Sequence, residues 1–254
     1  MIGHLGRACA AETMKLRGTL ALVMALVAPL VVVLLFSAQL LLMPLPATSE
    51  GDGGLAWQML SDGALGLWCF LMLPLYITLQ AALLANVEHA NRQWKHLLAL
   101  PVPRQHHFLA KGWALALLSC ASAVMLYLAI LLAGQLLPLL RPSLGFHGAA
   151  PWQSLSGAIL AATAASALMA VLQLFIALRA RSFTLAVGVG MAAAVSGFMV
   201  GQSHRYGPLY PWTMPLHTTT QDGQYQWTLA VAGLASALAL GGLLAAWLGR
   251  YPPE

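Results

Sequence analysis

Four histidines lie in one polar segment of this 254-residue chain, and imidazole is the side chain best suited to binding metals and transferring protons near neutral pH. They occupy positions between two apolar stretches: His89, His96, His106 and His107. Their spacing does not match H-E-x-x-H, which places two zinc-binding imidazoles on one face of a helix. An isolated His-His pair in a basic loop is usually solvated, so we predict no metal site and no catalytic residue.

Motifs for nucleotide hydrolysis and acyl transfer are absent from the sequence. A P-loop requires G-x-x-x-x-G-K-[ST], and no Gly-Lys dipeptide occurs in the chain. The G-x-S-x-G elbow of serine hydrolases is also absent. Three isolated cysteines, Cys9, Cys69 and Cys120, indicate no disulfide framework. We therefore expect a chain that is not an enzyme and holds no cofactor, so that any energy from ATP must come from another protein.

The composition is that of a protein surrounded by lipid. Hydrophobic residues make up 60% of the chain and charged residues 7%, whereas a soluble domain has roughly 45–50% apolar and about 25% charged residues. So few charges could not cover a soluble surface, but they suit an exterior that faces lipid. We interpret the net charge of +5 as a topology signal and expect no nucleic-acid partner.

Six apolar stretches predict an all-α integral membrane protein with one transmembrane domain over residues 1–254. Each stretch has roughly 19 residues or more, which is enough for a helix to cross a hydrocarbon core of about 30 Å. None contains an Asp, Glu, Lys, Arg or His, which disfavours a buried proton relay. The predicted spans are residues 19–43, 63–85, 112–140, 152–178, 183–201 and 227–248.

Lys and Arg are distributed unevenly between the two sides of these spans. Of the 12 basic residues, only Arg141 and Arg205 fall on one side, and the first loop on that side carries Glu50, Asp52 and Asp62. Basic residues favour cytoplasmic loops. We therefore predict that both termini lie in the cytoplasm.

The N-terminal 18 residues are compatible with a helix that lies in the membrane interface. Ile2, Leu5, Cys9 and Leu16 fall roughly on one face, as an interfacial helix requires. The alternative is a basic flank that only sets topology.

The segment between the second and third spans is compatible with a short cytoplasmic helix. Glu88 and Arg92 form an i,i+4 pair of favourable order, and Trp94 adds an aromatic ring beside Lys95. Prolines at 101 and 103 then end the helix. The segment suits docking of a cytoplasmic partner, and the alternative is an ordinary basic loop.

The last external loop is rich in proline and aromatic residues. Tyr206, Tyr210 and Trp212 suit the headgroup region, while Pro211 and its neighbouring prolines predict a structured, bent or partly re-entrant segment. The segment could gate a substrate or simply anchor the chain at the interface.

Polar and small residues within the spans predict helix contacts. Four glutamines either hydrogen-bond between helices or line a path, and we favour the structural role: Gln39, Gln80, Gln135 and Gln173. Small residues recur at four-residue spacing, which permits close helix packing: Gly157, Ala161 and Ala165, then Ala193, Gly197 and Gly201.

Three short runs lie between the second and third spans: Asn86-Val87-Glu88-His89, Arg92-Gln93-Trp94-Lys95 and Leu100-Pro101-Val102-Pro103-Arg104, followed by Lys111. They resemble the first cytoplasmic loop of ABC-2 type permeases, and most of all the branch associated with lantibiotic and bacitracin self-protection. Members of that branch have a basic interfacial N-terminal helix, six spans and a Trp-Lys pair before a proline-containing turn. The Tyr210-Pro211-Trp212 loop is also similar to that branch.

The resemblance implies a permease subunit that pairs with a second copy or a sibling permease and docks separate ATPase subunits, which bind ATP and Mg²⁺. The helix between spans two and three would be the coupling helix, with Glu88, Arg92, Trp94 and Lys95 touching the ATPase. It further implies export of a hydrophobic or amphipathic substrate, such as an antimicrobial peptide, across a bacterial cytoplasmic membrane, and hence antibiotic resistance.

Two other interpretations stay open from the residues themselves. One is a non-catalytic membrane scaffold or assembly factor. The other is a membrane enzyme that uses the loop histidines, which would need a catalytic cluster that the sequence does not display. The substrate, the pairing of permease copies, and transport as opposed to extraction from the outer leaflet are not determined by the sequence.

Overall fold

The computed structural model describes residues 2–42, 53–90, 104–146, 149–180, 182–219 and 225–250, and every regular element in these ranges is a helix. The α-helices are α1 Ile2–Lys15, α2 Leu20–Leu42, α3 Gly53–Leu67, α4 Leu73–Ala90, α6 Arg104–Leu140, α7 Trp152–Ala165, α8 Ala167–Arg179, α9 Phe183–Val200, α10 Met214–His217 and α11 Gln226–Arg250. A π-helical turn, Trp68–Met72, joins α3 to α4, and two 3₁₀ turns are Pro142–Leu144 and Gly207–Leu209.

Among the described residues, six helical segments are long and apolar enough to cross a membrane. They are Leu20–Leu42, Gly54–Asn86, Gln105–Leu140, Trp152–Arg179, Phe183–Val200 and Gln226–Gly249. Their number and helical nature confirm the predicted all-α fold with six spans.

Two of these segments begin earlier than predicted. The second begins at Gly54 rather than at residue 63, and the third at Gln105 rather than at residue 112. With a rise of about 1.5 Å per residue, each is roughly 50 Å long and exceeds a hydrocarbon core of about 30 Å. Their ends therefore carry ionisable residues that the predicted spans did not contain, including Asp62 and Lys111.

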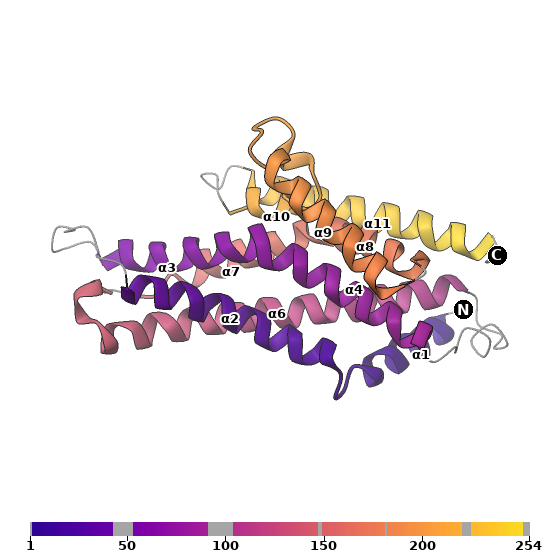
Figure 1. Cartoon of the computed structure of the whole chain (residues 1–254), viewed down its shortest axis with the longest axis horizontal. Coiled ribbons are helices and arrows are strands. Elements are labelled where there is room, and N and C mark those ends of the chain that lie inside the picture. The colour runs from indigo at the N-terminus through magenta and orange to yellow at the C-terminus, as the bar shows by residue number, and fades with distance from the viewer. Residues whose placement is uncertain are drawn as a thin grey trace.

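The long helices run side by side along the molecule (Figure 1). Helix α1 and the C-terminal end of α11 lie at the same end, together with the junction between α8 and α9. The end of α2 and the turn after α6 lie at the opposite end. We call these the termini end and the far end. The layout agrees with an even number of crossings.

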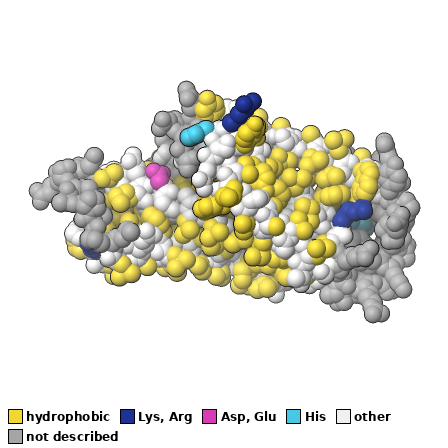
Figure 2. Space-filling model, turned by 45° about the horizontal axis from the view of Figure 1, so that its top comes forward, with side chains coloured by type: hydrophobic (Ala, Val, Ile, Leu, Met, Phe, Trp, Pro, Cys, Tyr) yellow, Lys and Arg dark blue, Asp and Glu magenta, His cyan; other side chains and the backbone are white. Residues whose placement is uncertain are grey.

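Apolar side chains cover much of the outside of the bundle. Figure 2 shows them spread across the middle of one face, with Lys and Arg side chains toward its edges. Leu34 on α2, Leu132 on α6 and Val195 on α9 are among the exposed hydrophobic residues. Such a belt is expected where lipid is the solvent.

Buried glutamines join neighbouring helices. Gln80 on α4 donates from Nε2 to the Ala21 carbonyl of α2 at 2.8 Å, and Gln173 on α8 donates to the Ala186 carbonyl of α9 at 2.9 Å. Both side chains are fully buried. These bonds confirm the structural role expected for these two glutamines, although their amide oxygens have no hydrogen-bond partner among the described residues.

Proline explains the irregular turn in the second span. Pro74 has no N–H to donate and its ring would clash with the carbonyl four residues earlier, at Phe70. The chain forms the π-helical turn Trp68–Met72 at this place, which accommodates both effects. The fourth span is interrupted at Ser166, between α7 and α8.

Arg141 closes the far end of the first span. Its Nη1 donates to the carbonyls of Leu40 and Leu41, at 3.2 and 3.1 Å, in the last turn of α2. A cation at a helix C-terminus pairs with carbonyls that lack helical partners and with the negative end of the helix dipole. The side chain therefore holds the ends of α2 and α6 together.

Small residues allow α7 and α11 to touch. A Cβ added to Gly233 of α11 would lie 2.7 Å from the Cα and the carbonyl oxygen of Ala165 on α7. Ala165 is one of the small residues predicted to support close contact, and this approach confirms that prediction. The backbones could not come so close with any larger residue at position 233.

We therefore expect Gly233→Ala to destabilise the fold, although alanine is the better helix former by about 1 kcal/mol. The added methyl group must separate two backbones, and overpacking of this kind costs about 1–3 kcal/mol. Gly242→Ala in the same helix is the matched control, because nothing lies within 4 Å of its added Cβ. Thermal unfolding in detergent tests the pair, and an equal midpoint for both variants would contradict the assignment.

Candidate functional site

Helix α1 packs against α6 at the termini end of the bundle. Leu16 is buried, Leu5 and Cys9 are half-buried, and Arg7 is exposed. The face that was predicted to enter the membrane interface thus contacts protein. Whether α1 also lies in the interface remains a prediction.

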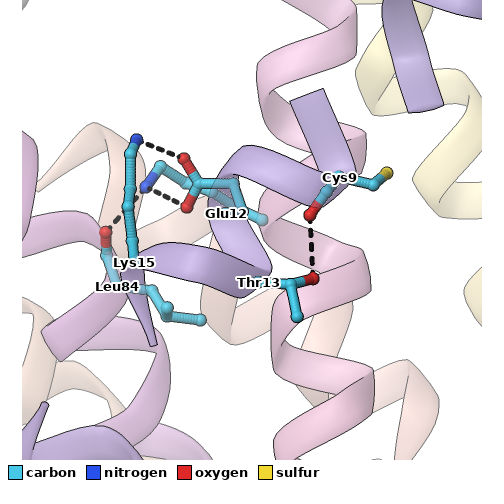
Figure 3. A network of polar contacts seen from close by, with 6 residues as sticks. Cys9, Glu12, Thr13, Lys15 and Leu84 are labelled. Carbon is cyan, nitrogen blue, oxygen red and sulfur yellow. Dashed lines mark hydrogen bonds and ion pairs between the residues drawn. The ribbon is translucent and has the colours of Figure 1, made fainter. Parts of the chain in front are cut away.

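Glu12 lies on the same inner face of α1 and is 6% exposed. Its Oε1 accepts from Lys15 Nζ at 2.6 Å, and its Oε2 pairs with Lys111 Nζ of α6 at 3.5 Å (Figure 3). Each carboxylate oxygen therefore faces one ammonium group, and a buried charge requires compensation of this kind.

Lys111 extends the network to a third helix. It is 2% exposed, and its Nζ donates to the Leu84 carbonyl of α4 at 2.8 Å (Figure 3). One ammonium group thus joins α1, α4 and α6. We call Glu12, Lys15, Lys111 and the Leu84 carbonyl the charge clamp.

The charge clamp keeps Glu12 ionised. Burial by itself would raise the pKa of this carboxyl group, but the charges of Lys111 and Lys15 and their hydrogen bonds outweigh it. The net pKa is below the ordinary value of 4.5. At neutral pH Glu12 is therefore a carboxylate.

The charge clamp includes residues from the helices before and after the predicted coupling loop. Leu84 precedes Glu88 by one helical turn on α4, and Lys111 follows the start of α6. The backbone of Glu88 lies in the last turn of α4. Its side chain, together with Arg92, Trp94, Lys95 and the predicted coupling helix, lies outside the described residues. The assignment of these four residues to coupling stays a prediction.

The segment after α9 is ordered and folds back on the bundle. Tyr210 donates from its hydroxyl to the Ala193 carbonyl at 2.8 Å, and the same hydroxyl lies 2.8 Å from Ser196 Oγ. Short turns at Gly207–Leu209 and Met214–His217 shape the segment. This bent structure agrees with the prediction from its prolines.

Two glycines, one in the last turns of α9 and one directly after it, allow this segment to pack closely against the helix. Thr213 Cγ2 lies 3.1 Å from the Cβ positions that Gly197 and Gly201 lack, and Thr213 Oγ1 donates to the Gly207 carbonyl at 2.7 Å. The predicted small-residue stripe on this span therefore packs against its own following loop. Trp212 is buried and its ring lies 5.5 Å from that of Tyr210.

The four predicted gate residues differ in environment. Tyr206 is 59% exposed, whereas Tyr210 and Pro211 are half-buried and Trp212 is buried. Burial lowers the pKa of nearby His217, and the charge of His204 lowers it further while the Gly201 carbonyl opposes both. Burial thus favours the neutral form of the His217 imidazole. Of the four residues, only Tyr206 has an exposed aromatic ring, while the other three pack against the protein. The role of the segment as a gate stays a prediction.

Sequence reasoning missed the charge clamp, although a signal was present. Glu12 is an acidic residue on the apolar face of a basic helix, and such a residue needs a cation opposite. Lys111 was assigned to the flank of a span because apolar stretches do not reveal where a helix begins. Among the described residues, no group of three His, Cys, Asp or Glu side chains could hold a metal ion.

The chain matches a known protein family. A family model described as ABC-2 family transporter protein matches residues 8–197, about three quarters of the chain. The matched range includes the charge clamp and α2 through most of α9. No curated protein and no solved structure matches the chain.

We expect Glu12→Gln to weaken the attachment of α1, because it leaves Lys111 buried without its carboxylate. Breaking a buried ion pair typically costs about 3–5 kcal/mol. Thermal unfolding and hydrogen exchange over residues 2–15 measure the effect. In the unmodified chain, this stability is present above the ordinary pKa of 4.5 and is lost as the pH falls through the lower folded-state pKa.

Asp62→Asn is the matched control, because it makes the same carboxylate-to-amide change at an exposed position. We expect a change within about 0.5 kcal/mol. If the two variants unfold alike, Glu12 does not hold α1 in place.

Proposed function

The chain belongs to the ABC-2 family of transporter proteins, and from this premise we propose that it is the membrane permease of an ATP-driven exporter. The family and the six apolar helices make it a transporter permease subunit. The sequence contains no P-loop, so ATP and Mg²⁺ would be bound by a separate cytoplasmic ATPase. The proposal depends most on one observation, the link that Lys111 makes between the two helices bordering the predicted docking loop.

That link supplies a route for force. An ATPase seated on residues 86–111 would move the loop when its dimer closes on ATP. Lys111 lies on α6, on one side of the loop, and donates to the Leu84 carbonyl of α4 on the other side. The same ammonium group pairs with Glu12 of α1. The three helices would therefore shift together. In this proposal Glu88, Arg92, Trp94 and Lys95 contact the ATPase, and the charge clamp passes the movement to the spans.

A hydrophobic or amphipathic substrate, such as an antimicrobial peptide, suits spans of this composition. The buried glutamines of the spans, Gln80 and Gln173, are neutral, and neutral groups favour cargo without a buried counter-ion. The path would run between two permease copies, either identical or sibling chains. The segment that contains Tyr206, Tyr210, Pro211 and Trp212 would form the outer gate.

The distribution of basic residues supports the orientation. Figure 1 places α1 and the end of α11 at one end, and the excess of Lys and Arg in the sequence belongs to that end. We propose that this end faces the cytoplasm of a bacterium, where the ATPase is available. The aromatic segment after α9 then faces outward.

Co-purification with an ATPase encoded beside this chain tests the docking assignment. We expect Glu88→Lys and Trp94→Ala each to lower ATPase binding and efflux by about tenfold, because truncating an interface anchor costs above 1 kcal/mol. Glu50→Lys and Trp152→Ala make the same changes at positions that the sequence predicts to face the other side of the membrane, and they should leave binding unchanged.

Full ATPase binding and transport in both Glu88→Lys and Trp94→Ala would show that the coupling assignment is wrong. Normal ATPase binding without energy-dependent efflux in the unmodified chain would instead favour a scaffold. Stoichiometric zinc or iron in the purified chain would favour an enzyme that uses the loop histidines.

A further inference from the structure

A pocket of about 310 Å³ lies beside the charge clamp, where α1, α2 and α4 meet. Its apolar walls come from all three helices and include Leu16, Ala21 and Leu83. Small-ligand pockets have volumes of about 300–1,000 Å³, so this one can take part of a long molecule such as an acyl chain. The mainly apolar walls favour a hydrocarbon group.

Polar groups line another part of the same pocket. Glu12, Lys15, Thr19 and Asn86 all contribute to its lining. The side chain of Lys15 is 42% exposed, in contrast to the buried Glu12 and Lys111. An ammonium group has three N–H donors, and Lys15 uses one on Glu12. Lys15 can therefore donate to a ligand while it stays in the charge clamp.

One cation beside the pocket is accessible from outside. Lys15 shares the Glu12 carboxylate with the buried Lys111, and Lys15 is the exposed member of the three. A phosphate oxygen accepts well from lysine. The pocket thus combines an apolar wall with a site for negative charge.

The pocket opens where the chain enters the apolar belt. Leu20, which lines it, is 54% exposed, and Val23 one turn later is 51% exposed. Arg17, between α1 and α2, is exposed as well. Basic side chains followed by exposed aliphatic ones mark the depth at which lipid headgroups give way to acyl chains.

We propose that this pocket binds one anionic phospholipid from the leaflet at the termini end. The phosphate group accepts from Lys15, and an acyl chain lies against Leu16, Ala21 and Leu83. The lipid places an anion beside the exposed Lys15 and fills the space between α1, α2 and α4. This site goes beyond the proposed export function and rests only on the placement of α1 at a membrane surface.

Native mass spectrometry of the purified full chain tests the site. The chain in mild detergent is mixed with equal amounts of phosphatidylglycerol and phosphatidylethanolamine, and the lipid retained per chain is counted. We expect one phosphatidylglycerol to be retained in preference to phosphatidylethanolamine. Lys15→Gln should lower its retention about fivefold, the effect of one basic side chain near an anionic lipid surface.

Two further variants separate charge from shape. Leu83→Trp leaves every charge in place but fills the pocket, and it should also lower retention. Arg7→Gln removes the same charge as Lys15→Gln from an exposed position of α1 outside the pocket, and it should retain the lipid as the unmodified chain does.

Three results would overturn the proposal. One is equal retention of the two lipids, and another is equal loss in Lys15→Gln and Arg7→Gln, which indicates general attraction to the membrane. The third is a folded Leu83→Trp variant that retains the lipid fully. If Leu83→Trp does not fold, the comparison of lipid retention in Lys15→Gln and Arg7→Gln decides whether the pocket binds the lipid. None of these measurements depends on transport, so the exporter assignment is tested separately.

Discussion

The ammonium group of Lys111 is charged and almost completely buried, and this single constraint organises the termini end of the protein. A charge in such a place is tolerated only if it is paired and hydrogen-bonded. Glu12 supplies the counter-charge from α1, and the Leu84 carbonyl supplies an acceptor from α4. The position of the N-terminal helix is therefore set by a side chain on α6. The Nζ atom of Lys111 contacts both α1 and α4.

The two ends of the bundle are held together by different kinds of interaction. At the termini end, charges select their partners and fix one arrangement. At the far end, Arg141 caps α2, and in the segment after α9 the glycines at the end of α9 admit Thr213 while Tyr210 bonds to a helix carbonyl. Contacts of this kind require side chains to come close to the helix backbone. One turn before Leu84 on α4, the buried amide of Gln80 joins α4 to the first turn of α2 without adding charge.

The sequence was sufficient to predict six helices, because a bilayer demands long apolar runs and few other patterns satisfy that demand. It did not reveal where the helices at Gly54 and Gln105 begin, since a helix can continue past the hydrocarbon core. The charge clamp was missed for a related reason. Glu12 and Lys111 lie 99 positions apart in the sequence, and only the packing of α1 on α6 brings them together. The coupling residues Arg92, Trp94 and Lys95 lie outside the described residues, so their prediction still rests on sequence resemblance.

The central claim is that Glu12 and Lys111 act as a pair that joins α1 to the helices on both sides of the predicted docking loop. A double-mutant cycle with Glu12→Gln, Lys111→Met and their combination measures this pairing directly through the free energy of unfolding. The account predicts that the double variant is more stable than the sum of the single effects allows, with a coupling energy of about 0.5–3 kcal/mol. Additive effects, equal within about 0.3 kcal/mol, would contradict it.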